Sequence, residues 1–406
     1  MQQLNRQKNP ILCLIFLPVL LMGICILKYS VNFPFSDQWP LAIMFEKIYS
    51  NNLSLSDLFS QFHESRKFFP RLIFIGLAYL TNWDVRYEML VIFLLTCIIS
   101  LNIYCLSRLT LRSNFITVLF LLAISNLLIF SPAQYENWLW GIQVVVYIPI
   151  ACLTGCLVIA KKKLSLRTKL IICFCLCTVS TFSYANGMLT WLLVFPALTI
   201  LASGKWQEIF TKNIWIIVSG LLGFITNAVV YFYDYQKPDK HPSFLSAISH
   251  PVDTFHYFLA FLGAPLAFEN LTVATIVGAL VFSLWIFLCW QIFRLVKTDF
   301  ILLHRLIVWL IIGVYAIISG AVTALGRVGF GVGQALAPRY TAFSLYLMVS
   351  LIYLLAIFCL VASQNNTRKK LIKYNSLLLI TIFLVLHINT IINAIDRMSD
   401  RRVILL

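Results

Sequence analysis

The sequence predicts an all-α, polytopic membrane protein in which residues 1–406 form a single integral domain. Three observations predict this class. Hydrophobic side chains make up 61% of the chain and charged ones only 11%, whereas soluble domains carry roughly 25% charged residues. The mean hydropathy is +0.89. Finally, apolar runs recur with the length of about 20 residues that an α-helix needs to cross a bilayer, which predicts about 11 transmembrane helices.

Each expected span is an apolar run bounded by charged or turn-forming residues. The first follows a short basic N-terminus, and no small-residue cleavage site follows it, so we expect an uncleaved helix. Two other runs, 68–81 and 255–268, contain Pro70 and Pro265. Their length of about 14 residues favours re-entrant or interfacial segments. The expected spans are 11–28, 87–107, 115–131, 143–160, 169–184, 188–203, 214–232, 271–293, 303–323, 341–362 and 374–393.

The basic residues predict the orientation. If 68–81 and 255–268 do not span, one side of the membrane holds the N-terminus and the loops near 108–112, 161–169, 205–212, 294–305 and 368–373. This side carries 18 of the 31 Lys and Arg residues and 2 of the 15 acids, and the positive-inside rule makes it cytoplasmic. The net charge of +16 therefore reflects topology, and we expect membrane lipid rather than nucleic acid as a partner. The short loops favour a bacterial plasma (inner) membrane. The distribution of basic residues then places the N-terminus on the cytoplasmic side, and we expect the active site on the outer face.

The segment 29–86 is the expected outer catalytic loop. Its parts 40–50 and 55–62 have helical periodicity with one apolar face, as interfacial helices do, and Ser54 or Ser56 is a suitable cap for the second. Asp37 follows the first span at the membrane surface. A carboxylate there can act as a general base on an acceptor hydroxyl. The alternative is that Asp37 only caps the helix 40–50.

Charged residues gather just before Pro70. Glu64 is a candidate second catalytic carboxylate, and His63 is a candidate catalytic partner. The two are also conceivable metal ligands, but the chain has no HExxH or DxD string, so we assign no metal residue and leave a divalent cofactor open. Arg66, Lys67 and Arg71 are candidates for neutralising a phosphate leaving group, and the guanidinium groups can form bidentate contacts with it. The alternative is a solvated rim whose cations face lipid phosphates.

Two later outer segments carry further candidates. In PAQYENWLWG (132–141), aromatic faces can pack on sugar C–H surfaces while amide and carboxylate groups bind hydroxyls; an interfacial aromatic belt is the alternative. In GRVGFGVGQALAPRY (326–340), glycines let backbone N–H groups approach a phosphate, unless they mark only a flexible turn. The candidate substrate-binding residues are Glu136, Asn137, Trp138, Arg327, Gln334, Arg339 and Tyr340, with Arg339 as the expected ligand of a lipid phosphate.

The order of these features resembles the GT-C class of polytopic glycosyltransferases, such as protein O-mannosyltransferases and aminoarabinose transferases. The resemblance covers roughly residues 10–110. It consists of the acid Asp37 after the first span, an amphipathic loop, a charged residue before Phe69-Pro70, the pair Asn82-Trp83, and Arg86 leading into the next span. The class typically has a second acid where this chain has Gln38, and Pro-Pro where it has Phe69-Pro70.

The resemblance implies a GT-C-like fold and a polyprenyl-phosphate sugar donor on the outer face, with Asp37 as the catalytic carboxylate and His63, Glu64 or Arg66 as the charged residue before the proline. We therefore expect an inverting glycosyltransferase that acts on a hydroxyl of a glycan, lipid or protein acceptor. A lipid or polysaccharide flippase or transporter without transferase activity is the alternative, and a structural subunit is a third. Ion-coupled transport is disfavoured, because the middle parts of the predicted spans contain no acid.

Overall fold

The structure is a computed structural model that describes residues 2–111, 113, 115–238, 242, 244–297, 299–362 and 366–406, with side chains described outside 2–10 and 362–384. Within these residues, nine helical segments are long and apolar enough to cross a membrane. The chain is therefore an all-α, multi-pass membrane protein. The nine segments are Ile11–Tyr29, Arg86–Thr110, Phe115–Trp138, Gly141–Lys161, Ala185–Ala202, Ile214–Phe232, Leu271–Val296, Phe300–Phe330 and Pro338–Val361.

Two further predicted spans fall on helices outside this set of nine. The run 169–184 corresponds to α9 (Leu166–Thr181), which has 16 residues. At about 1.5 Å per residue this helix is about 24 Å long, shorter than a typical hydrocarbon core of about 30 Å. The run 374–393 lies within α18 (Asn366–Leu405), a helix of 40 residues, and the side chains of its residues 374–384 lie outside the described set.

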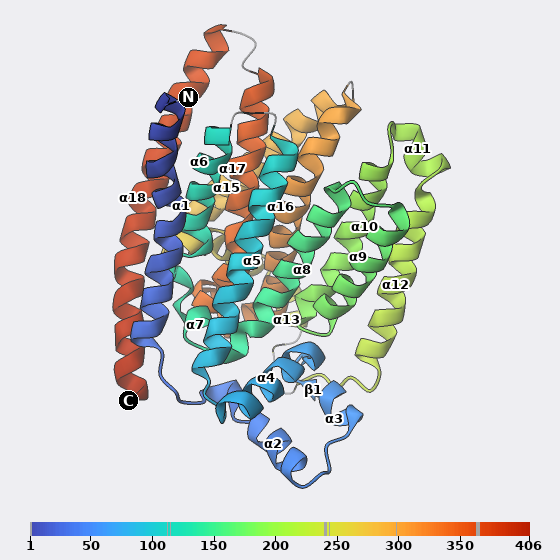
Figure 1. Cartoon of the computed structure of the whole chain (residues 1–406), viewed down its shortest axis with the longest axis vertical. Coiled ribbons are helices and arrows are strands. Elements are labelled where there is room, and N and C mark those ends of the chain that lie inside the picture. Colours follow the sequence, from blue (N-terminus) through green and yellow to red (C-terminus); the bar gives the residue numbers. More distant parts are fainter. Residues whose placement is uncertain are drawn as a thin grey trace.

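The long helices run side by side between two ends of the molecule (Figure 1). The N-terminus lies at one end and the C-terminus at the other, and α1 and α18 are neighbours along one edge. Burial separates a central helix from peripheral ones: 83% of the apolar window of α8 is buried, against 22% for α1, α12 and α15. The long helices include α1 (Gln2–Tyr29), α5 (Arg86–Thr110), α6 (Phe115–Ile129), α8 (Val144–Lys161), α10 (Leu189–Ala202), α12 (Ile214–Phe232), α15 (Leu271–Val296), α16 (Phe300–Arg327) and α17 (Thr341–Ala362).

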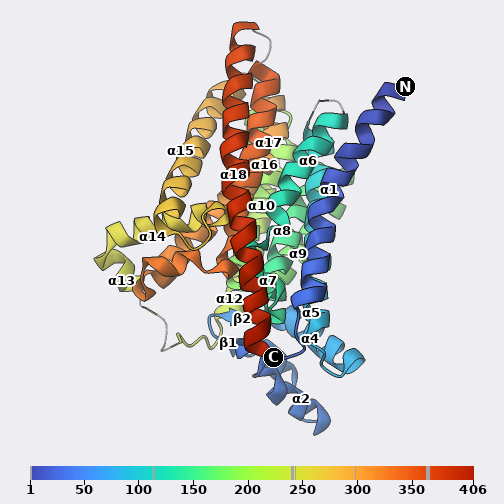
Figure 2. The ribbon, with the colours of Figure 1, turned by 90° about the vertical axis from the view of Figure 1, so that its left-hand side faces the viewer.

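The second short apolar run falls on a helix whose C-terminal half is buried against its neighbours. Helix α14 (Pro251–Gly263) contacts α15 closely, because Gly263 and Gly278 leave no side chain between the two backbones. A Cβ added to Gly263 would lie 1.9 Å from the carbonyl oxygen of Ala274. Figure 2 shows α14 and its preceding helix extending from one side of the bundle. The smaller elements next to it are α13 (Phe244–Ser249) and η5 (Ala264–Leu266), whereas α11 (Trp206–Thr211) packs on α12.

The loop after α1 folds into short elements at the end of the molecule that also holds the C-terminus (Figures 1 and 2). Helix α3 begins where predicted, because the Ser54 side chain accepts a hydrogen bond from the Asp57 backbone. It ends early, at Phe59, since a two-stranded hairpin follows. The elements are η1 (Ser36–Gln38), α2 (Leu41–Tyr49), α3 (Leu55–Phe59), β1 (Gln61–Phe62), β2 (Ser65–Arg66) and α4 (Phe68–Thr81).

Several single-turn elements bring later parts of the chain to this same end. They precede or follow the long helices, and most are 3-10 turns. Together with the first loop they form a layer of irregular backbone, which is where a membrane protein can place polar chemistry outside the hydrocarbon. They are η2 (Pro132–Gln134), α7 (Tyr135–Trp138), η3 (Gly141–Gln143), η4 (Ala185–Met188), η6 (Val328–Phe330), η7 (Val332–Leu336) and η8 (Pro338–Tyr340).

Candidate functional site

Asp37 lies in the one-turn helix η1, and its carboxylate is 36% exposed. The neighbouring Gln38 anchors this turn: its buried amide donates to Glu88 at 2.6 Å and accepts from the Phe35 backbone. His63 Nε2 lies 3.6 Å from an Asp37 carboxylate oxygen. The structure thus brings together two of the predicted catalytic residues. The alternative role of Asp37 as a cap is wrong, because Pro40 occupies the N-cap of α2.

A cavity of about 220 Å³ opens beside Asp37. Its walls combine apolar side chains with five ionisable ones, and three of these five are cations. The arrangement therefore favours an anionic group next to an apolar one, which is the composition of a lipid phosphate. The ionisable side chains are Asp37, Lys47, Asp57, Lys67 and Arg71.

Lys67 is one of two buried cations of this cavity, with 7% of its surface exposed against 6% for Arg71. Its ammonium lies 4.1 Å from the centre of the Phe62 ring. Burial lowers the pKa of Lys67 to about 8, and the charges of Asp37 and Glu64 partly oppose this effect. An ammonium so poorly solvated gains more from a bound anion than an exposed one does.

Two predicted phosphate ligands are committed to backbone carbonyls. Arg66 donates to the carbonyls of Tyr231 at 2.6 Å and Phe59 at 2.7 Å, and also to that of Tyr233. Arg71 donates to those of Leu58 and Ser60 at 2.8 and 2.6 Å. In this structure Arg66 therefore fixes the loop to the end of α12, while Arg71 fixes the chain after α3 and still lines the cavity.

Glu64 connects the first loop to a segment 263 residues away. Its carboxylate accepts from Arg327 at 2.5 Å, and the Glu64 carbonyl accepts from the Tyr231 hydroxyl at 2.8 Å. Tyr184 lies within electrostatic range of both partners of this ion pair, and burial raises its pKa. The predicted residues Glu64 and Arg327 thus meet at the same end of the molecule as Asp37.

A second ion pair joins the other two predicted segments. Arg339 donates to Glu136 at 3.2 Å, and the Asn137 amide donates to the Arg339 carbonyl at 3.3 Å. Tyr340 is buried beside the Arg339 guanidinium. Gln334 is held in η7, and its buried Oε1 has no hydrogen-bond partner among the described residues. These candidates converge, although Arg327 and Arg339 do not line the cavity beside Asp37.

Trp138 requires a correction, because its side chain is fully buried. The indole N–H donates to the Ser131 carbonyl at 2.9 Å, and the ring packs against Phe130 and Tyr147. An aromatic ring enclosed in this way has no face for a sugar in this conformation. Trp138 is therefore a core residue that supports the turn carrying Glu136.

The C-terminal helix contributes a residue that sequence reasoning missed. Arg401 of α18 lies over the Phe35 ring, 4.5 Å from its centre, and within electrostatic range of Glu136. Its buried Nε and Nη2 atoms have no hydrogen-bond partner among the described residues. These two atoms form one edge of the guanidinium, and this edge can donate two hydrogen bonds to a carboxylate or phosphate. Arginine-rich composition in the tail DRMSDRR was the only available signal.

Among the described residues, no group of three or more His, Cys, Asp or Glu side chains is arranged to hold a metal ion. Comparison of the chain with family models, with curated proteins and with solved structures found no match. Its function must therefore be inferred from the residues just described.

Proposed function

We propose that the protein is a membrane glycosyltransferase that moves a sugar from a polyprenyl-phosphate donor to an acceptor hydroxyl. One observation carries this proposal: the partly exposed carboxylate of Asp37 shares a cavity with the buried ammonium of Lys67, and cations outnumber acids in that cavity. A base for a hydroxyl and a positive charge for a phosphate lie side by side there. Apolar cavity walls beside them suit a lipid-linked donor.

In the proposed reaction, Asp37 takes the proton of the acceptor hydroxyl as its oxygen attacks the anomeric carbon of the donor sugar. The bond between that carbon and the phosphate oxygen breaks, and polyprenyl phosphate leaves with the electron pair. Attack from the face opposite the phosphate inverts the anomeric configuration. Lys67 stabilises the charge that develops on the leaving oxygen, because a fixed cation in a poorly solvated site interacts strongly with it.

The remaining candidates have supporting roles in this proposal. His63 orients the Asp37 carboxylate, which lies 3.6 Å away. The Glu64–Arg327 and Glu136–Arg339 pairs hold the later outer segments against the first loop. We further propose 11 membrane crossings, because α9 and α18 add to the nine longer apolar segments. The positive-inside rule then makes the N-terminus cytoplasmic and the site external, in a plasma membrane.

The test is transfer from a polyprenyl-phosphate sugar by the purified full-length protein in lipid vesicles. Asp37→Asn should lower the rate about 10²–10⁴-fold while donor binding is kept. Asp253→Asn, at an exposed position of α14, is the matched control and should transfer normally. A transporter would move the donor across the vesicle membrane and leave the sugar–phosphate linkage intact. Normal transfer by Asp37→Asn would reject this residue as the base.

A further inference from the structure

A second, larger hollow lies between the C-terminal helix and the turn that leads into α15. It has a volume of about 410 Å³ and is open to the outside. One wall is a face of α18, where polar residues recur at i, i+3, i+4 and i+7: Asn393, Asp396, Arg397 and Asp400. The other wall comes from Phe268, Glu269 and Asn270. We call this hollow the α18 groove.

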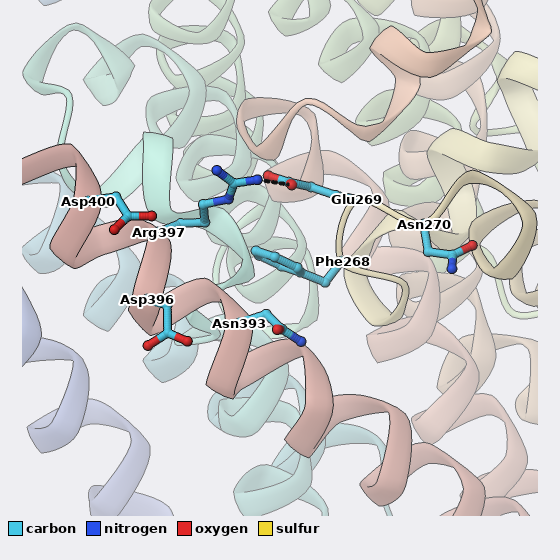
Figure 3. A pocket seen from close by; sticks show the side chains of 7 residues that line it. All are labelled: Phe268, Glu269, Asn270, Asn393, Asp396, Arg397 and Asp400. Atoms are coloured by element: carbon cyan, nitrogen blue, oxygen red, sulfur yellow. Dashed lines mark hydrogen bonds and ion pairs between the residues drawn. The ribbon is translucent and has the colours of Figure 1, made fainter. Parts of the chain in front are cut away.

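The side chains of the α18 groove have a definite arrangement (Figure 3). Arg397 crosses to Glu269 and binds its carboxylate at 2.6 Å. The Phe268 ring lies between this ion pair and Asn393, whereas the Asn270 side chain points away. The side-chain oxygen of Asn270 accepts a hydrogen bond from the Val273 backbone N–H and so caps α15. An aromatic face thus lies next to carboxylate and amide oxygens.

The charge of the α18 groove selects the kind of ligand. Three carboxylates line it against one guanidinium, so a phosphate, sulfate or carboxylate would be repelled. A hydrocarbon chain would leave the polar walls without hydrogen bonds. An uncharged ligand rich in hydroxyl groups avoids both the repulsion and the loss of hydrogen bonds. Its hydroxyls donate to carboxylate oxygens, and the C–H face of a sugar ring packs on an aromatic side chain.

The α18 groove is connected to the candidate site by direct contacts. The Tyr135 hydroxyl donates to Glu269 at 3.5 Å, and Tyr135 precedes Glu136, the partner of Arg339. One turn beyond Arg397, Arg401 lies over the ring of Phe35, two residues before Asp37. The same end of α18 therefore contacts both the groove and the loop that carries the proposed base.

We propose that the α18 groove binds the acceptor, and that this acceptor is a sugar chain without phosphate, sulfate or carboxylate groups. The role of this sugar as the acceptor rests on the proposed transferase function, whereas its binding in the α18 groove does not. The outer face is then divided by charge: the cavity beside Asp37 and Lys67 takes the anionic donor, and the α18 groove takes an uncharged, hydroxyl-rich ligand.

The test measures binding without turnover. Full-length protein in nanodiscs is titrated with maltotetraose and with chitotetraose, and separately with sulfated maltotetraose, using saturation-transfer NMR. The unsulfated tetrasaccharides should bind and the sulfated one should not. The double variant Asn393→Ala, Asp400→Ala should weaken binding at least ten-fold, whereas Asp253→Ala and Asp37→Asn should bind as the unchanged protein does.

Two outcomes would overturn the proposal: no binding of either unsulfated tetrasaccharide, or equal binding by the double variant. The double variant should also retain binding of a polyprenyl phosphate, which shows that it is folded. Loss of transfer in Asp37→Asn with normal tetrasaccharide binding supports both proposals. Normal transfer by Asp37→Asn with sugar binding that depends on Asn393 and Asp400 would reject the proposed base and keep the groove.

Discussion

Replacing Lys67 by Met should stabilise the protein and abolish the proposed sugar transfer. The pKa of Lys67 falls from its ordinary 10.5 to about 8 because the ammonium is buried. Each pKa unit between the folded and unfolded states corresponds to about 1.4 kcal/mol, so keeping the charged form buried costs about 3 kcal/mol at neutral pH. This figure already includes the attraction of Asp37 and Glu64. Methionine keeps the length and apolar contacts of the side chain and removes this cost.

The pH dependence of the unfolding free energy provides an independent check. Below about pH 8, Lys67 is protonated in both states, and the cost of burying its charge is fully present. Between about pH 8 and the unfolded pKa of 10.5, the folded state has released the proton while the unfolded state still holds it. The free energy of unfolding must therefore rise with pH in that window because of Lys67. This rise should vanish in Lys67→Met.

The assay is SDS-induced unfolding in mixed micelles at several pH values, together with donor binding and transfer. Lys47→Met is the matched control: its ammonium is 42% exposed and pairs with Asp57 at 2.5 Å, so its removal should not stabilise. If Lys67→Met unfolds more easily than the unchanged protein, burial does not dominate at this site. If the variant transfers sugar at the normal rate, Lys67 does not serve the leaving group.

Three further substitutions test the framework around the site. Arg66→Gln removes hydrogen bonds to three carbonyls and should cost about 3 kcal/mol, measured as faster proteolysis of the first loop. Gly141→Ala places a Cβ 2.1 Å from a Glu88 oxygen, so it should distort the turn that carries Asp37 and slow transfer. Gly76→Ala is the control, because the added Cβ meets no neighbouring group within 4 Å, and it should fold and transfer normally. Glu64→Gln breaks the pair with Arg327 and, because both side chains are partly exposed, should cost only about 0.2–1 kcal/mol, measured by a double-mutant cycle with Arg327→Gln; zero coupling energy would refute the contact.

Features set by neighbouring residues were predictable from the sequence. The start of α3 follows from the Ser54 side chain and the Asp57 backbone, three residues apart, and capping of this kind is a local rule. The apolar spans are also local, because length and composition decide them. The end of α3 was missed, since the hairpin that follows places His63 at a φ of 51°, a conformation that helical periodicity does not reveal.

Features set by distant residues were not predictable in detail. The sequence marked Arg66 as a cation near lipid phosphate, but its acceptors lie at Tyr231 and Tyr233, more than 160 residues later. Trp138 belongs to a segment that also suits a sugar site, and only its packing shows that the ring is enclosed. An arginine or tryptophan in a membrane protein has several uses, and the choice depends on the partners that the fold supplies.

The two long-range ion pairs explain why the candidate site depends on the whole bundle. Glu64–Arg327 and Glu136–Arg339 join residues separated by 263 and 203 positions, and both arginines follow or begin long apolar segments. Partly exposed pairs contribute little stability on their own, so the bundle must hold their partners together rather than the reverse. A shift of α16 relative to the first loop would therefore move Arg327 away from Glu64. Lipid thickness, which changes the tilt of such helices, should for this reason alter transfer more than it alters binding of a sugar in the α18 groove.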